Sequence, residues 1–344
     1  MTDEALHRAL SRRLYQKAIA QGTITLPAVP GMLDEYVSMC DRVFKSIGVT
    51  FTDEQLANLR DVIKGQLAEA FSASSRSEIV ITYDSPAGLM VNYHVKAQWS
   101  SIAAAYDHWT ATREPPYFGT EPDARVWSLA LTADDPTAFP VLDLGAGTGR
   151  NALPLARRGH PVDAVEVAPV FARGLREECE SEVLPVRVLE RDAFTSRDDL
   201  RRDYRLMVVS EVASDFRTTD ELRQVFELAG ECLAPGGLLV MNVFVPRDAY
   251  VPDDAARELA QQCYSSIFTR AEIDAALAGL PLALESDVSV YDYEMAHLPS
   301  GAWPPTHWYE RWISGQDVFD VDRDASPIEM RWLVFRKTAS IGQR

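Results

Sequence analysis

The apolar positions of the chain change their spacing near residue 140. Between residues 33 and 67 they recur every three or four residues, as in amphipathic helices, and Thr52 and Gln55 form the sequence of a helix capping box. Between residues 78 and 95, two stretches of β-branched and aromatic residues flank a Ser-Pro-Ala-Gly turn, which is typical of a β-hairpin. We therefore expect an N-terminal helical region with a β-hairpin. Its second helix is expected to bury Leu56, Leu59, Val62, Ile63 and Leu67.

From Pro140 onward, short apolar stretches alternate with helical patterns, which predicts a parallel sheet with helices on both faces. The stretches begin near Val141, Val162, Val186, Leu206 and Leu238. Two further stretches, residues 282–293 and 329–336, have no fixed helical crossover between them and fit an antiparallel pair at one edge. The predicted fold is thus α/β, with a Rossmann-like, doubly wound, seven-stranded sheet and an antiparallel C-terminal strand pair.

Prolines and glycines around residues 114–119 indicate a junction between two parts of the chain. We expect residues 1–110 to form an accessory or lid region and residues 111–344 to form the sheet domain. The domain is expected to carry an insertion at about residues 245–315.

The net charge of −17, from 34 Lys and Arg against 51 Asp and Glu, repels phosphate backbones, so no nucleic-acid partner is expected. No apolar run approaches the roughly 18 residues of a membrane span, and the charged first residues lack a signal sequence. We therefore expect a cytoplasmic protein without a membrane partner. The four cysteines have no metal-binding spacing, so reduced thiols and no metal site are expected. The oligomeric state stays open, a homodimer included.

The first strand of the alternating region leads into a turn with three glycines, Gly145, Gly147 and Gly149. In a doubly wound sheet this turn is the prime ligand site, because glycine lets a ligand approach the backbone. The following helix, expected from Arg150, would point its N–H groups at the ligand. A dinucleotide fingerprint would need a small residue in place of Arg150, and Asp143 would repel a pyrophosphate but could hold an ammonium group. The pattern predicts a zwitterionic ligand.

Two carboxylates follow the next two strands. Glu166 lies about 20 residues past the loop, where it can accept hydrogen bonds from two ribose hydroxyls, and Asp192 can accept from an adenine amine. Alone, Glu166 could be a surface residue. Together with Asp143-Leu-Gly-Ala-Gly-Thr-Gly149 and Leu233-Ala-Pro-Gly-Gly237, however, the set resembles the successive motifs of class I S-adenosylmethionine-dependent methyltransferases, over about residues 120–337.

The resemblance implies S-adenosyl-L-methionine as the cofactor and the second region as its binding domain. It places Asp143 at the amino group of the cofactor, Glu166 at the ribose and Asp192 at the adenine. The other residues that it implies for cofactor binding are Gly145, Ala146, Gly147, Gly149, Val167, Ala193 and Ser210.

Methyl transfer also needs an acceptor in line with the C–S bond and, for a protonated acceptor, a base. Glu211 could be that base or orient an amine, or it could only contact the cofactor or cap a helix. His108 and Tyr106 are further catalytic candidates, because histidine accepts a proton near neutral pH and the segment could cover the cofactor. Packing of an aromatic helix face is the alternative. The residues expected to bind the acceptor are Trp109, Ser214, Asp215, Asn242, Phe244 and His307.

The sequence therefore predicts methyl transfer to O or N of a small-molecule acceptor by in-line displacement. Two alternatives remain open. One is a non-catalytic cofactor-binding scaffold or partner subunit, and the other is transfer of a different group from the sulfonium.

Overall fold

The computed structural model describes residues 2–17, 19–74, 76–86 and 90–338, and the side chains of Thr2, Gln16, Ile102, Ala103 and His108 lie outside this description. Contacts between residues divide the chain into two compact units, residues 1–101 and 102–344. Helix α4 (Ile102–Ala111) therefore belongs to the second unit. Of the helices in the described ranges, none combines the length and apolar character needed to span a bilayer.

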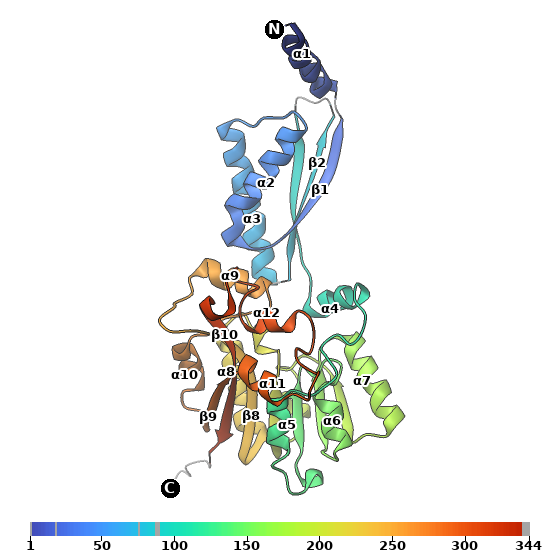
Figure 1. The fold of residues 1–344 in the computed structure, drawn as a ribbon, viewed down its shortest axis with the longest axis vertical. Helices are drawn as coiled ribbons and strands as arrows, with labels where there is room; N and C mark the ends of the chain where they lie inside the picture. Colours follow the sequence, from blue (N-terminus) through green and yellow to red (C-terminus); the bar gives the residue numbers. More distant parts are fainter. Residues whose placement is uncertain (1, 18, 75, 87–89, 339–344) are drawn as a thin grey trace. The chain divides into compact units, whose positions relative to one another are not determined.

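The first unit packs two helices against one face of a three-stranded antiparallel sheet, in the order β1-β2-β3 (Figure 1). Its elements are α1 (Thr2–Lys17), β1 (Ala20–Pro27), α2 (Leu33–Ser46), α3 (Asp53–Ala73), β2 (Glu78–Ser85) and β3 (Asn92–Gln98). Phe44 of α2, Ile63 of α3 and Ile81 of β2 are fully buried in its core. Side chains at every second strand position enter this core, as the two-residue period of a strand requires.

The capping box at the start of α3 is confirmed. The Thr52 hydroxyl accepts from the Gln55 N–H at 3.3 Å, and the Gln55 side chain accepts from the Thr52 N–H at 2.9 Å. The antiparallel β2–β3 pair confirms the predicted hairpin. Val62, expected in the core, is 43% exposed because it lies beside the buried stripe of α3. Strand β1 was not predicted.

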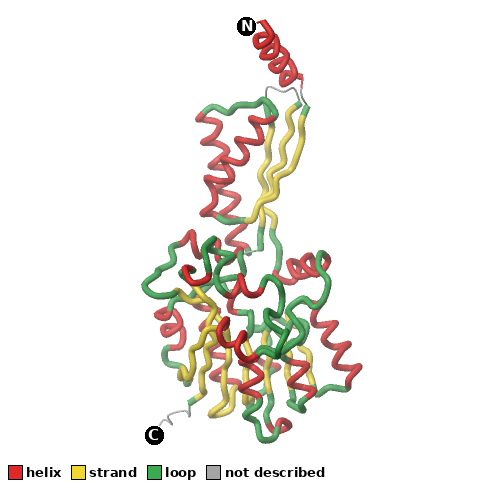
Figure 2. The backbone as a smooth tube through the Cα atoms, in the orientation of Figure 1, coloured by secondary structure: helices red, strands yellow, loops and turns green. Residues whose placement is uncertain are grey.

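The second unit is a seven-stranded sheet with helices on both faces (Figures 1 and 2). Its elements are α4, α5 (Ala124–Ala130), β4 (Val141–Leu144), α6 (Ala152–Arg157), β5 (Val162–Glu166), α7 (Pro169–Glu182), β6 (Val186–Glu190), β7 (Tyr204–Val209), α8 (Thr219–Cys232), β8 (Leu233–Pro246), α9 (Asp254–Gln262), α10 (Arg270–Leu277), β9 (Leu282–Ser289), α11 (Val290–His297), α12 (Tyr309–Ile313) and β10 (Ile328–Lys337). The strand order is β6-β5-β4-β7-β8-β10-β9.

Neighbouring strands from β6 to β8 are parallel, and β10 is antiparallel to both β8 and β9. The predicted doubly wound sheet with an antiparallel C-terminal pair is confirmed. Alternate residues of the central strands face opposite cores: Val208 contacts the core with α5, α6 and α12, and Met207 the core with α8 and α10. Strands buried on both faces must be apolar at nearly every position, which is why they were recognisable in the sequence.

Three element boundaries differ from the prediction. The helix expected from Arg150 begins only at Ala152 and has six residues. The strand expected to reach Tyr293 ends at Ser289, because the Ser289 hydroxyl accepts from the Asp292 N–H at 3.3 Å and starts α11. The motif Leu233-Ala-Pro-Gly-Gly237, placed before the strand expected from Leu238, lies inside β8. The region 245–315, predicted as an insertion, contains α9 to α12 and also β9 of the sheet.

A buried carboxylate, that of Glu294 on α11, joins three segments of the second unit. It accepts hydrogen bonds from the Ala124 N–H at 2.7 Å, the Arg125 N–H at 3.1 Å and the Trp332 indole N–H at 2.9 Å. Burial, together with the nearby Asp123, raises the pKa of Glu294 to about 7. The carboxylate thereby satisfies free N–H groups at the start of α5 and links that helix to β10.

Replacing Glu294 with Ala should lower the free energy of unfolding by about 2–4 kcal/mol, because three buried donors lose their acceptor. Denaturant unfolding of the full chain measures this loss. Glu294→Gln keeps one acceptor oxygen and should lose clearly less. Equal stability of Glu294→Ala and the unmodified protein would show that water replaces the carboxylate without cost.

Candidate active site

A cavity of about 490 Å³ opens in the second unit at the carboxyl ends of β4, β5, β6 and β7. Its remaining walls come from α4, residues 263–264 and residues 307–317. Ligands of open α/β sheets bind at this end of the strands, and the volume lies within the range of small-molecule sites.

The glycine turn after β4 forms the floor of the cavity. Gly145 has φ +72°, and a Cβ atom there would lie 2.3 Å from the Val212 side chain, so only glycine fits. The Gly145 and Ala146 N–H groups donate to the Val165 carbonyl at 2.8 and 3.0 Å, which ties the turn to β5. Gly145, Ala146 and Gly147 line the cavity. Gly149 is not among the described lining residues; a Cβ there would collide with Leu175 and Leu153, so this glycine serves helix packing.

Asp143 lies at the end of β4 with only 2% of its surface exposed. Its Oδ2 atom has no hydrogen-bond partner within the described part of the chain, although it lines the cavity. Burial raises the pKa of Asp143 to about 7, and the neighbouring Asp123 and Glu166 add to the rise, whereas Arg150 opposes it. The Ala152 N–H bonds to this carboxylate, but a buried carboxylate oxygen without a partner is costly, and a cation in the cavity would relieve that cost. The residue therefore fits the ammonium group that the sequence predicts.

Glu166 ends β5 and is 4% exposed. One carboxylate oxygen accepts from the Gly147 N–H and the other from the Ala168 N–H, both at 2.7 Å. Burial raises its pKa, and these hydrogen bonds oppose the rise. The Val167 N–H also interacts with this carboxylate, so of its roughly four acceptor positions at least one remains for a ligand hydroxyl. Glu166 thus holds the glycine turn and also lines the cavity.

The carboxylate of Asp192 follows β6 at the exposed end of the cavity. Its Oδ1 atom accepts from the Phe194 N–H at 2.9 Å, which shapes the loop that carries both residues. Val167, Ala193 and Phe194 line the same end of the cavity. This end of the cavity therefore offers a flat apolar group with a polar edge both apolar surface and a hydrogen-bond acceptor.

Asp123, which precedes α5, organises the inner wall. Its carboxylate accepts from the Arg150 guanidinium at 2.6 Å, from the Asn151 amide at 2.8 Å and from the Ser210 hydroxyl at 2.6 Å. The second end of the guanidinium donates to Glu211 at 2.5 Å. These contacts hold the Arg150 and Asn151 side chains, which directly precede α6, against Asp123. Ser210 and Arg150 both line the cavity.

Glu211 has φ +60°, a conformation that is rare for residues other than glycine. The buried Asn242 side chain accepts from the Glu211 N–H at 2.7 Å and so holds this backbone in place. Burial raises the pKa of Glu211 to about 7 despite the ion pair with Arg150. Strained backbone of this kind persists only where the surroundings enforce it, and it is frequent at functional sites.

Aromatic residues of α4 and of the loop after it cover one side of the cavity. Trp109 stacks on Phe118 with ring centres 5.3 Å apart, and the Tyr106 ring meets the edge of Phe171 at 5.4 Å. Tyr106, Trp109 and Phe118 all line the cavity. The side chain of His108, predicted to take part in catalysis, lies outside the described residues.

Three of the six residues expected to bind an acceptor line another part of the cavity. Ser214, Asp215 and the exposed His307 line it, next to Tyr264, Trp308 and Trp312. The Trp312 indole donates to the Tyr264 carbonyl at 2.9 Å, which fixes the ring. Asn242 and Phe244 are fully buried and are not among the described lining residues. Side chains inside strand β8 point into the cores, so Asn242 acts through Glu211 and Phe244 packs against Trp312.

Sequence reasoning missed Asp123 and the residues at 263–264 and 317. Asp123 is separated by 27 residues from Arg150, and no local pattern reveals that the two meet. Within the described residues, no group of three or more His, Cys, Asp or Glu side chains is placed to hold a metal ion.

The chain matches a family model described as a methyltransferase domain over residues 141–237, which include the glycine turn, Glu166, Asp192 and Glu211. No curated protein matches the chain. Similar solved structures include a putative sarcosine dimethylglycine methyltransferase from Galdieria sulphuraria (18% identity, TM-score 0.47, 63% of this chain and 85% of that one). Others are a geranyl diphosphate C-methyltransferase from Streptomyces coelicolor A3(2) (14%, 0.48, 62% and 79%) and the 4+2 cyclase SpnF (18%, 0.45, 63% and 81%).

The matched segment supplies the floor and the acidic wall of the cavity, and the sheet has the predicted class I topology. The chain therefore carries a methyltransferase domain, whose matched part is residues 141–237.

Proposed function

We propose that the domain transfers the cofactor's methyl group to an oxygen or nitrogen atom of a small molecule. The observation that carries the proposal is the continuity of one cavity of about 490 Å³, from Asp143 and the glycine turn to Tyr264, His307 and Trp308. Both reactants fit into this one enclosure, as an in-line displacement needs. A scaffold that only binds the cofactor would have no use for the part of the cavity that Tyr264, His307 and Trp308 line.

The cofactor, when bound, supplies a methyl group on a positively charged sulfur. We assign Asp143 to its ammonium group, Glu166 to the ribose hydroxyls and Asp192 to the adenine amine. Asp143, Glu166 and Glu211 give this region an excess of carboxylates over the guanidinium of Arg150. Such an excess favours a ligand with positive groups.

We assign Glu211 to the acceptor. A carboxylate with a pKa near 7 can take a proton from an attacking hydroxyl, or from an ammonium group before the resulting amine attacks, close to neutral pH. Arg150 keeps the side chain in place by its second hydrogen bond, and Asn242 fixes the backbone behind it. Tyr106 and Trp109 close the opposite wall and exclude water from the reacting atoms.

The direct test incubates the protein with the cofactor and a panel of small alcohols, phenols and amines, and weighs the products. We expect a gain of one CH₂ unit, and we expect Glu211→Gln to lower turnover more than cofactor affinity, because glutamine keeps the contact with Arg150 but cannot take the proton. A product with a different added mass would refute methyl transfer. Cofactor binding without turnover on any acceptor would favour a scaffold.

Replacing Glu166 with Ala should weaken cofactor binding by about 1–3 kcal/mol, because the ribose hydroxyls and the Gly147 N–H lose their acceptor. Glu190 ends the adjacent strand in register with Glu166, is paired with Arg176 and does not belong to the described cavity wall. Glu190→Ala is therefore the matched control and should leave affinity unchanged. Calorimetric titration with the demethylated cofactor measures the affinity of both variants. Equal affinities of the two variants would remove Glu166 from the ribose role.

Cofactor affinity should fall as the pH decreases below about 7. Asp143 has a raised pKa, so the carboxyl group is protonated below that value and cannot attract an ammonium group, whereas at higher pH it is ionised. Binding above that pH should need no proton release, and binding below it should release one proton. Titrations between about pH 5.5 and 7.5 in buffers of different ionisation enthalpy measure both effects.

Asp143→Asn is the control for this pH dependence, since its side chain has nearly the same shape and does not titrate. It should bind more weakly and lose the part of the pH dependence that Asp143 causes. Should its pH profile match that of the unmodified protein, Glu211 or Glu166 would be responsible instead.

A further inference from the structure

Helix α1 (Thr2–Lys17) exposes three leucines on one face. Leu6 is 59% exposed, Leu10 57% and Leu14 68%. They are spaced by four residues, so they form one stripe about 12 Å long at 1.5 Å per residue. Single exposed leucines are ordinary, but a contiguous apolar stripe on an otherwise polar helix marks an interaction surface.

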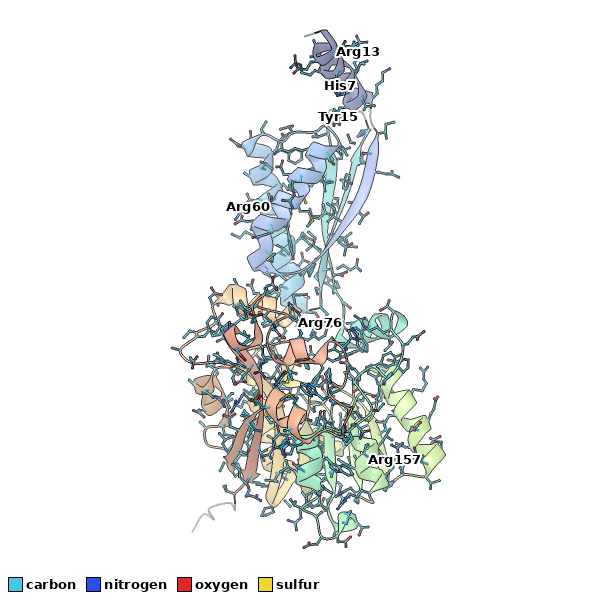
Figure 3. All side chains as sticks on the ribbon, in the orientation of Figure 1. His7, Arg13, Tyr15, Arg60, Arg76 and Arg157 are labelled. Atoms are coloured by element: carbon cyan, nitrogen blue, oxygen red, sulfur yellow. The ribbon has the colours of Figure 1, made fainter. Side chains whose placement is uncertain are left out.

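The stripe points away from the contact that α1 makes with its own unit. Tyr15, labelled with His7 and Arg13 in Figure 3, lies against the turn after α2, where a Cβ atom at Gly48 would collide with it. Successive helical residues are about 100° apart, so Tyr15 is turned well away from the direction of Leu10. The leucines therefore do not lie on the side of α1 that contacts the rest of the first unit.

Charged residues extend the leucine face at both ends. Asp3 lies seven residues before Leu10 and Lys17 lies seven residues after it, which is about two helical turns in each direction. In the described part of the chain, neither of them is in an ion pair. Glu4 and Arg8, by contrast, pair with each other at 3.0 Å on another side of the helix.

The pattern is symmetric about Leu10. Leu6 and Leu14 are each four residues from it, and Asp3 and Lys17 are each seven residues from it and carry opposite charges. A two-fold axis through Leu10 would place Leu6 against Leu14 of a second copy and Asp3 against Lys17 of that copy. Interfaces with two-fold symmetry require this kind of self-complementary surface. A parallel pair would instead bring Asp3 against Asp3.

We propose that α1 is a dimerisation helix that pairs antiparallel with α1 of a second copy of this chain. Leu10 lies at the centre of the interface, and two Asp3–Lys17 ion pairs close its ends. A helix of 16 residues is about 24 Å long, so one helix pair buries less than the roughly 800 Å² per partner of a standard interface. The dimer is accordingly weak and forms as the protein concentration rises.

Sedimentation equilibrium of the full chain over a wide concentration range tests the proposal. We expect a reversible monomer–dimer equilibrium, and Leu10→Asp should raise its dissociation constant by at least about tenfold, since two carboxylates would be buried at the centre. Val251→Asp is the matched control: Val251 is 76% exposed, lies in the second unit and should leave the equilibrium unchanged. A monomer at every concentration overturns the proposal, and so does a dimer that Leu10→Asp leaves intact.

Charge reversal tests the antiparallel orientation and excludes simple loss of the helix as the cause. Asp3→Lys and Lys17→Asp should each weaken the dimer by about fivefold, because each puts like charges together at both ends. The double variant Asp3→Lys/Lys17→Asp restores opposite charges across the interface and should recover the original dissociation constant. A double variant as weak as either single variant, or weaker, overturns the antiparallel pairing.

Discussion

The inner wall of the active site depends on one buried guanidinium. Arg150 has 8% of its side chain exposed and donates to Asp123 at 2.6 Å and to Glu211 at 2.5 Å. These two carboxylates come from segments 88 residues apart, before α5 and after β7, so the arginine ties the start of α5 to the loop after β7. A buried ion group of this kind tolerates no single removal, because each partner left behind is an uncompensated charge.

The carboxylates around Arg150 carry more negative charge than its single guanidinium neutralises. Arg150 neutralises part of the charge of Asp123 and Glu211, and Asp143 keeps an unpartnered oxygen in the cavity wall. A positively charged ligand would therefore improve the electrostatics of the cavity. A ligand that binds only the folded domain also raises its free energy of unfolding by mass action.

Local patterns were sufficient for the central strands, the glycine turn and the capping box at Thr52. Each depends on residues close together in sequence, such as the run Val141–Leu144 followed directly by Gly145. Strand β1 escaped prediction because its outward positions are Gln and Thr, and a glycine and a proline interrupt its pattern. The part played by Asp123 escaped for another reason. It depends on contacts between Asp123 and the residues after Gly149, and only the folded chain brings these together.

Strand β10 shows what the order of the strands implies for the assembly of the domain. The last strand along the chain, Ile328–Lys337, lies between β8 and β9 instead of at the border of the sheet. During synthesis, one side of β8 therefore stays unpaired until more than eighty further residues have been made. Strand β9 has no neighbouring strand before then. The Trp332 indole N–H, the third donor to the Glu294 carboxylate, is also in place only at this stage. The catalytic unit consequently closes late, from its C-terminal end, and the nascent chain exposes an unpaired sheet border that invites association with other chains.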